Sequence, residues 1–79
     1  MTQQNQHNLV KFQGDLKAIR LKQVLVKTGL CRSAIYAKAK AGEFPTPIKL
    51  GGGRSSAWLE HEIDYWLKLQ VQISRPNFE

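Results

Sequence analysis

The chain has 79 residues, of which 12 are Lys or Arg and 6 are Asp or Glu, so its net charge is +6. A chain of this length forms one domain at most and buries only about 60 % of its unfolded surface, which leaves little material for a deep substrate pocket. We therefore expect a small binding module that is not an enzyme and needs no cofactor.

The chain is expected to have three parts. Residues 1–17 are predicted to form a flexible arm, because the first residues are polar and rich in Gln and Asn. The folded domain is expected to span residues 18–73, beginning with an extended segment at 19–21. Residues 74–79 are expected to form a C-terminal tail.

The first helix is predicted from apolar and small residues at positions i, i+3, i+4 and i+7, which share one helix face. These residues are Leu21, Val24, Leu25 and Thr28. Gly29 is expected to end this helix, because glycine adopts a positive φ without strain. Leu30 follows as an apolar residue in the turn between two helices.

The second helix is predicted over residues 32–41, which are rich in alanine. Cys31 falls at the position of its N-cap, and Gly42 is expected to end it. Ile35 and Ala39 are expected to point inward. Leu25, Leu30 and Ile35 then form the apolar contact that holds two helices across a turn, as in a helix-turn-helix.

Two short strands, 48–50 and 56–58, are predicted around the glycine-rich loop 51–55. Strand alternation places Ile48, Leu50 and Trp58 inward, and Lys49 and Ala57 outward. The predicted fold class is therefore mainly α with a small β-hairpin: a winged helix-turn-helix of three helices plus a two-stranded wing.

The third helix is predicted from an apolar stripe that continues to about residue 73. The stripe comprises Leu59, Ile63, Trp66, Leu67 and Val71. Acidic residues in its first turns are favourably placed against the helix dipole, and Asp64 is expected to pair with Lys68 four residues later.

The positive charge is concentrated in the predicted helix-turn-helix and hairpin. Residues 20–58 hold eight basic residues against Glu43, a net charge of +7, whereas residues 59–79 have a net charge of −2. A field of this kind attracts polyanions, of which nucleic acid is the commonest. The alternative, that the basic residues only keep a small domain in solution, is equally compatible with charge alone.

On the outward face of the second helix, Arg32 is expected to bind a guanine edge, and Ser33 a base edge or a phosphate. Lys38 and Lys40 suit phosphates, because an ammonium group makes little directional demand. Tyr36 is expected to donate to a phosphate or to pack against a sugar. The alternative is a helical hairpin whose charged face is only solvated.

The loop 51–55 has three interpretations. It lacks the pattern of a nucleotide-binding P-loop, so the choice is between a plain hairpin turn and a wing whose tip approaches the DNA backbone. Lys49, Arg54 and Ser55 are the residues predicted to contact phosphates, and the arginine also suits a narrow minor groove.

The sequence gives little support for metal binding, base stacking, a disulfide or a membrane location. A metal site at His61 is not expected, since residue 65 is Tyr where a zinc-protease helix has His. The large aromatic residues Phe44, Trp58 and Trp66 are expected in the core and not on a base-stacking surface. A single cysteine excludes an intramolecular disulfide. The chain has no apolar run of membrane-spanning length, so a cytoplasmic protein with no membrane partner is expected.

Several segments together resemble the AlpA family of phage and prophage regulatory proteins over roughly residues 18–70. They are Arg20-Leu21-Lys22, Thr28-Gly29-Leu30, Arg32-Ser33, Ile35-Tyr36, Gly42-Glu43-Phe44-Pro45, Pro47-Ile48-Lys49-Leu50-Gly51, Trp58-Leu59 and Trp66. The resemblance implies a winged-helix DNA-binding domain, distantly similar to MerR-type and excisionase domains. Cys31 stands where the family usually has a serine, and Ala37 where a basic residue is frequent.

The function expected from the residues and the resemblance is sequence-specific binding of double-stranded DNA by a transcriptional regulator of a phage or integrated element. The alternatives are an excisionase that acts with an integrase, and a protein-interaction module that uses the third helix to bind integrase or RNA polymerase. Dimeric or tandem binding on DNA is also expected, because one module offers little contact area.

Overall fold

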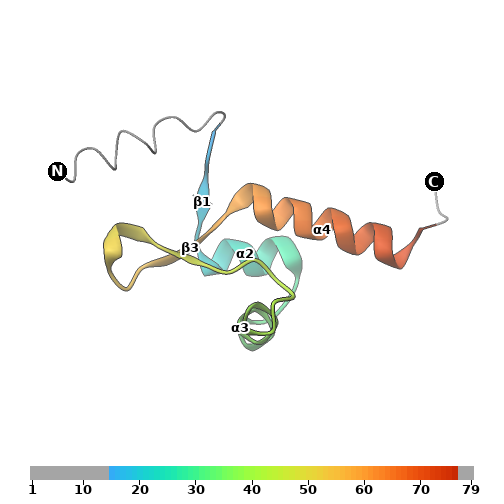
Figure 1. The fold of residues 1–79 in the computed structure, drawn as a ribbon, viewed down its shortest axis with the longest axis horizontal. Helices are drawn as coiled ribbons and strands as arrows, with labels where there is room; N and C mark the ends of the chain where they lie inside the picture. The colour runs from blue at the N-terminus through green and yellow to red at the C-terminus, as the bar shows by residue number, and fades with distance from the viewer. Residues whose placement is uncertain (1–14, 77–79) are drawn as a thin grey trace.

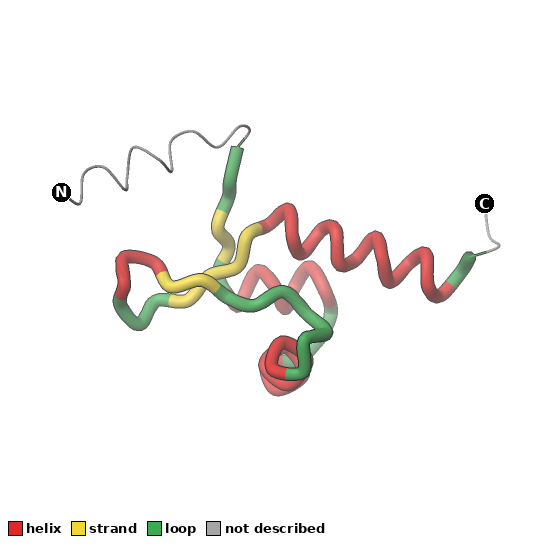
Figure 2. The backbone as a smooth tube through the Cα atoms, in the orientation of Figure 1, coloured by secondary structure: helices red, strands yellow, loops and turns green. Residues whose placement is uncertain are grey.

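The computed structural model describes residues 15–76, so most of the expected N-terminal arm, and the end of the expected tail, lie outside the described residues. Three helices lie to one side of a small sheet, whose hairpin end extends away from them (Figures 1 and 2). In chain order the elements are β1 (Ala18–Ile19), α2 (Leu21–Thr28), α3 (Arg32–Lys40), β2 (Ile48–Lys49), the 3₁₀ helix η1 (Leu50–Gly52), β3 (Ser56–Leu59) and α4 (Glu60–Ser74).

The sheet has three strands, in the order β1–β3–β2, where the sequence predicted two. Both pairs are antiparallel, with Ile19 opposite Trp58 and Ile48 opposite Ala57. The amide of Glu60 also donates to the carbonyl of Lys17 (2.8 Å), which extends the contact beside β1. A strand of two residues has no alternation to detect, so β1 was predicted only as an extended segment.

The core lies between the sheet and the helices. Its largest fully buried side chains come from the three α-helices and two strands: Ile19, Val24, Ile35, Trp58 and Ile63. Phe44 and Ala39 are also buried, and Leu25 and Leu30 pack against this cluster. Each buried aliphatic side chain contributes about 1.5–3 kcal/mol relative to an exposed one. The predicted contact of Leu25, Leu30 and Ile35 is thus part of the core.

The turn between α2 and α3 is closed by a glycine and a threonine. Gly29 has φ 75°, as predicted, and its amide donates to the carbonyl of Leu25 (2.8 Å). The Thr28 hydroxyl donates to the carbonyl of Val24 (2.8 Å) and accepts from the amide of Leu30 (3.2 Å). The bond to Leu25 satisfies a carbonyl that the end of the helix otherwise leaves unpaired, and Thr28 ties the amide of Leu30 back to the last turn.

The predicted orientation of the hairpin residues was partly wrong. Trp58 is buried as expected, but so is Ala57, whereas Ile48 and Leu50 are 37% and 39% exposed. Ala57 lies on the central strand, where a small methyl group is covered by neighbours on both sides. Ile48 lies on the edge strand β2, and Leu50 begins η1, so strand alternation no longer applies to it.

The third helix also forms a different ion pair from the predicted one. Among residues 15–76, Asp64 binds Lys27 (2.8 Å) instead of Lys68, and Glu60 binds the same ammonium group (3.2 Å). The hydrogen bonds to Asp64 and Glu60 raise the pKa of Lys27. These contacts join α2 to the start of α4.

In the described part of the chain, no helix has the length and apolar character needed to cross a membrane.

Candidate nucleic-acid interface

The helix α3 presents one buried face and one exposed face. Ile35 and Ala39 point into the core, as predicted. The exposed face carries four of the predicted site residues: Arg32, Ser33, Tyr36 and Lys40. Lys38 is half-buried, so it lies toward the edge of this surface.

Arg32 is held over an aromatic ring. Its guanidinium carbon lies 5.7 Å from the centroid of the Tyr36 ring, one helical turn further along. The Tyr36 ring in turn packs edge-on against Trp58 of β3, with the centroids 6.0 Å apart. Trp58 is fixed by a hydrogen bond from its indole nitrogen to the carbonyl of Pro45 (3.1 Å).

This stack connects the helix surface to the sheet, and sequence reasoning did not find it. The i, i+4 spacing of Arg32 and Tyr36 was a usable signal for the first contact. The second contact joins residues that are far apart in the sequence, and no local pattern predicts it. Because the ring restricts the arginine side chain, less conformational freedom is lost when the guanidinium binds a partner.

The start of α3 has an incomplete cap. Cys31 occupies the N-cap with extended backbone angles (φ −90°, ψ 167°), as predicted, but its side chain makes no capping hydrogen bond. Its Sγ lies 3.4 Å from Oγ of Ser33. The contact with the Ser33 hydroxyl is the largest cause that lowers the pKa of the exposed Cys31 thiol.

The hairpin loop owes its shape to two glycines. Gly51 and Gly52 have φ values of 68° and 72°, which favour glycine, and the amide of Leu50 donates to the carbonyl of Ser55 (2.9 Å). Arg54 and Ser55 are exposed. This compact loop holds the arginine at the end of the hairpin.

Lys49 differs from Arg54 because it already has a protein partner. Its ammonium group donates to the hydroxyl of Ser56 on the neighbouring strand (3.1 Å). Lys49 is nevertheless exposed, and its two other N–H donors can reach a further acceptor. The residue is therefore positioned by the hairpin while it keeps its charge available.

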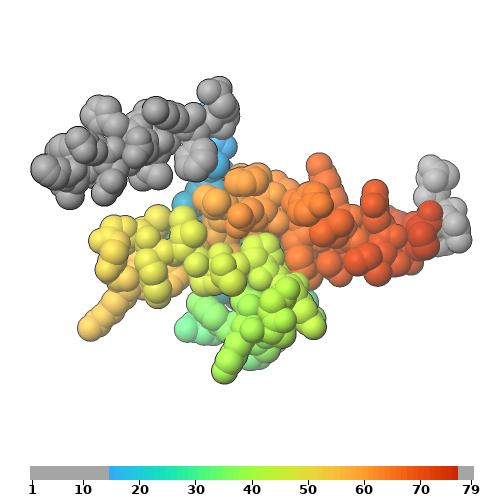
Figure 3. Space-filling view, viewed as in Figure 1, coloured from blue at the N-terminus to red at the C-terminus, as the bar shows by residue number. Residues whose placement is uncertain are grey.

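The hairpin and α3 form two separate protrusions. In the space-filling view the hairpin lies at the left and α3 at the bottom, while α4 extends to the right (Figure 3). No hydrogen bond or ion pair within residues 15–76 joins the loop 50–55 to α3. The structure thus brings Arg32, Tyr36 and Trp58 together and keeps Arg54 on a second element of the same scaffold.

The charges of this surface are not compensated within the protein. All the ion pairs among the described residues involve Lys27, which lies on α2. Five predicted site residues therefore carry a positive charge without a carboxylate partner in that part of the chain: Arg32, Lys38, Lys40, Lys49 and Arg54. Within the same residues no group of three or more His, Cys, Asp or Glu could hold a metal ion.

Comparison with known proteins agrees with the resemblance seen in the sequence. The family described as prophage CP4-57 regulatory protein (AlpA) matches residues 17–71. The uncharacterized protein ORF88 of Enterobacteria phage P4 is 41% identical over 61 residues, which cover 77% of this chain and 68% of ORF88. No solved structure is significantly similar. The chain therefore belongs to the AlpA family of prophage regulatory proteins.

Proposed function

We propose that this protein is a transcriptional regulator of a phage or integrated element that binds double-stranded DNA sequence-specifically in the host cytoplasm. In this proposal α3 enters the major groove, the β2–β3 hairpin contacts the adjacent backbone, and the protein has no catalytic role. Membership of a regulatory family supports the proposal. The observation that carries it is the exposed face of α3, on which Arg32 is stacked and has no carboxylate partner within residues 15–76.

Within this face, Arg32 is the residue assigned to base recognition. A guanidinium can donate two parallel hydrogen bonds to O6 and N7 of guanine, and its stacking on Tyr36 restricts the directions that it can take. Ser33 lies beside it on the same exposed surface and can donate to a base edge or a phosphate. Lys38 and Lys40, near the end of α3, suit the phosphates that border the groove.

The hairpin is assigned to the DNA backbone. The compact loop places Arg54 and the Ser55 hydroxyl at its end, and Lys49 follows one edge with its ammonium group fixed by Ser56. Contacts of this kind determine the register of a protein on DNA and carry no direct sequence information. Specificity is therefore assigned to α3 and affinity to both elements.

The first test is to select bound duplexes from a random pool and to titrate the selected duplex with salt. Phosphate contacts by four charged residues, Lys38, Lys40, Lys49 and Arg54, predict a slope of about −3.6 for log K against log salt concentration. Arg32→Ala should reduce the preference for the selected site over random DNA, while Lys40→Ala should weaken binding to both alike. A slope near zero, or equal losses on both DNAs for Arg32→Ala, would contradict the assignment.

An excisionase-type role requires the same DNA contacts, but the protein then bends the DNA beside an integrase. Measuring the bend of attachment-site DNA, with and without integrase, separates that role from transcriptional regulation. A module that uses the acidic side of α4 has less support, because Glu60 and Asp64 already bind Lys27. Retention of a protein partner by full-length protein that fails to bind any duplex at low salt would favour it.

A further inference from the structure

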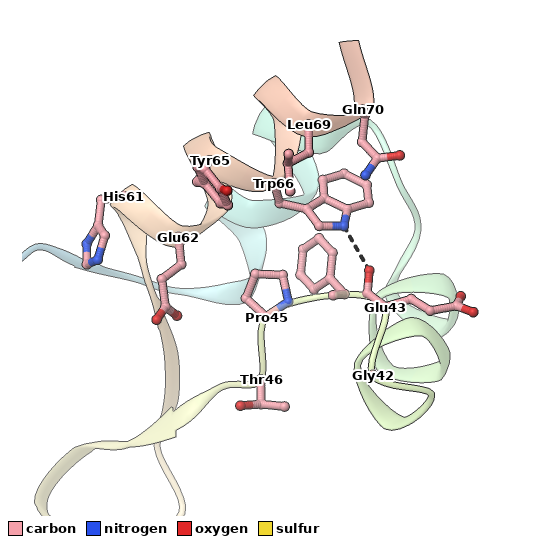
Figure 4. A pocket seen from close by; sticks show the side chains of 11 residues that line it. Gly42, Glu43, Pro45, Thr46, His61, Glu62, Tyr65, Trp66, Leu69 and Gln70 are labelled. Atoms are coloured by element: carbon pink, nitrogen blue, oxygen red, sulfur yellow. Dashed lines mark hydrogen bonds between the residues drawn. The ribbon is translucent and has the colours of Figure 1, made fainter. Parts of the chain in front are cut away.

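A groove runs between α4 and the loop that follows α3 (Figure 4). Its volume is about 630 Å³, and none of the residues assigned to DNA lines it. The loop carries the segment Gly42-Glu43-Phe44-Pro45, which is part of the family resemblance and has no place in the proposed DNA contacts. The groove is therefore a surface without an assigned role.

One wall of the groove is held in place by two tryptophans. The indole nitrogen of Trp66 donates to the carbonyl of Glu43 (2.8 Å), and that of Trp58 donates to the carbonyl of Pro45 (3.1 Å). Phe44, between these two loop residues, is buried and packs edge-on against Trp66, with the ring centroids 4.8 Å apart. Because this wall is already formed, little ordering of the protein opposes the binding of a partner.

The opposite wall is apolar and open to solvent. Tyr65 is 63% exposed and Leu69 is 37% exposed. They are four residues apart, so they share one face of α4. Removing this apolar surface from water favours a partner that brings an apolar side chain.

The charges of the groove indicate the rest of that partner's chemistry. The lining residues include two carboxylates, Glu43 and Glu62, and neither lysine nor arginine, although the whole chain has a net charge of +6. Neither carboxylate forms an ion pair with residues 15–76, and Glu62 is half-buried. Such a groove repels the phosphates of a nucleic acid and attracts cations. Figure 4 shows Glu62 at one end and Glu43 at the other, with Pro45 and Trp66 between them, so a fitting partner is basic at both ends and apolar in the middle.

The length of the groove sets the spacing of these groups in the partner. His61 and Gln70, the lining residues furthest apart on α4, are separated by about 13.5 Å along the helix axis. An extended chain covers this distance in about four residues, and its residues i, i+2 and i+4 point to the same side. An extended segment with basic residues at i and i+4 and an apolar residue at i+2 therefore matches the groove.

We propose that this groove binds an extended basic segment of a partner protein. The apolar residue of the segment lies against Tyr65, Leu69 and Pro45, and its two basic residues pair with Glu62 and Glu43. The groove shares no residue with the surface assigned to DNA, so this binding does not depend on the proposed function.

NMR titration of the full-length protein with a synthetic peptide tests this assignment. The probe is a nine-residue peptide with arginine at i and i+4, leucine at i+2 and serine elsewhere. The indole N–H signal of Trp66 should shift with a dissociation constant of about 1 mM or lower, and that of Trp58, which does not line the groove, should shift far less. An unchanged Trp66 signal, or equal shifts of both indoles, would overturn the proposal.

Two variants that each remove one negative charge test the role of the carboxylates. Glu62→Gln should weaken binding of the peptide about two- to fivefold, because a charged partner of one arginine is lost. Asp15→Asn is the matched control, since it makes the same change in net charge outside the groove and should leave the affinity nearly unchanged. Equal losses in both variants would show that the peptide responds only to net charge, and the assigned pairing would be wrong.

Two altered peptides test the apolar contact and the extended conformation. Replacing the leucine by serine, or moving the second arginine to i+3, should each weaken binding at least about fivefold. The second change turns one arginine to the opposite side of an extended chain, whereas a helical peptide would tolerate it. Undiminished binding of the first peptide contradicts the apolar contact, and undiminished binding of the second contradicts the extended segment.

Discussion

Replacing Cys31 by serine should give α3 the side-chain cap that it lacks. The backbone at this position already has the extended angles of an N-cap, so the substitution requires no rearrangement. A serine hydroxyl can accept from the amide of Ser33 or Ala34, whereas a thiol is a weak acceptor. Serine is also close to cysteine in shape, and the site is exposed, so no cavity or overlap is introduced.

The expected gain is about 1 kcal/mol, since removing a serine or threonine cap typically lowers stability by that amount. For a domain of this size, 1 kcal/mol corresponds to a rise in melting temperature of about 4–8 °C. Circular dichroism of the reduced protein at pH 6 measures this change. Cys31→Ala is the matched control, because it removes the contact with Ser33 and adds no cap.

The order of the three proteins decides the outcome. We expect serine to be the most stable, with alanine within about 0.5 kcal/mol of the wild type, because the wild-type side chain makes no capping bond that alanine loses. If Cys31→Ser melts no higher than Cys31→Ala, the capping argument is wrong, and α3 does not need a side-chain acceptor at its start.

Three other predictions concern the turn, the thiol and the stack beneath Arg32. Thr28→Val should lower the free energy of unfolding by about 1–3 kcal/mol, because it leaves the amide of Leu30 without an acceptor. Thr28→Ser keeps the hydroxyl and should lose far less. Equal losses for the two variants in chemical denaturation would contradict this. In the folded protein the thiol of Cys31 has a pKa below its ordinary value of 9.0. The stability of the reduced protein should therefore rise with pH between the folded pKa and 9.0, and this gain should be lost as the pH falls through the folded pKa. Melting curves of Cys31→Ser should lack this rise. Tyr36→Ala should weaken binding to a selected duplex about two- to fivefold by removing the ring beneath Arg32, and Tyr36→Phe should retain the stacking part of that affinity; fluorescence anisotropy that shows equal losses would assign the effect to the hydroxyl.

The helices and their ends could be predicted because their signals are local. The spacing of Leu21, Val24 and Leu25 indicated the buried face of α2, and Gly29 adopts the positive φ expected of a residue that ends a helix. The alternation rule worked for Trp58 and failed for Ala57, because it assumes that only one face of the sheet is covered, and at these two positions of β3 both faces are buried.

The contacts that position the candidate site were not predictable in the same way. Tyr36 meets Trp58, and Lys27 meets Asp64, across turns whose geometry determines the distance. The expected partner of Asp64 was four residues away on its own helix, but Lys27 lies closer once α2 packs against α4. Sequence reasoning identified the exposed residues of α3 and did not identify what holds them.

The pairing of β1 with β3 has a consequence for the order in which the fold is completed. Ile19 pairs with Trp58, which is made 39 residues later, whereas α2 and α3 are joined by a local turn. Closing so long a segment is slow compared with forming a helical hairpin. During synthesis α3 therefore leaves the ribosome before Trp58, the residue that supports Tyr36, and the surface that presents Arg32 becomes rigid only when β3 has joined the sheet.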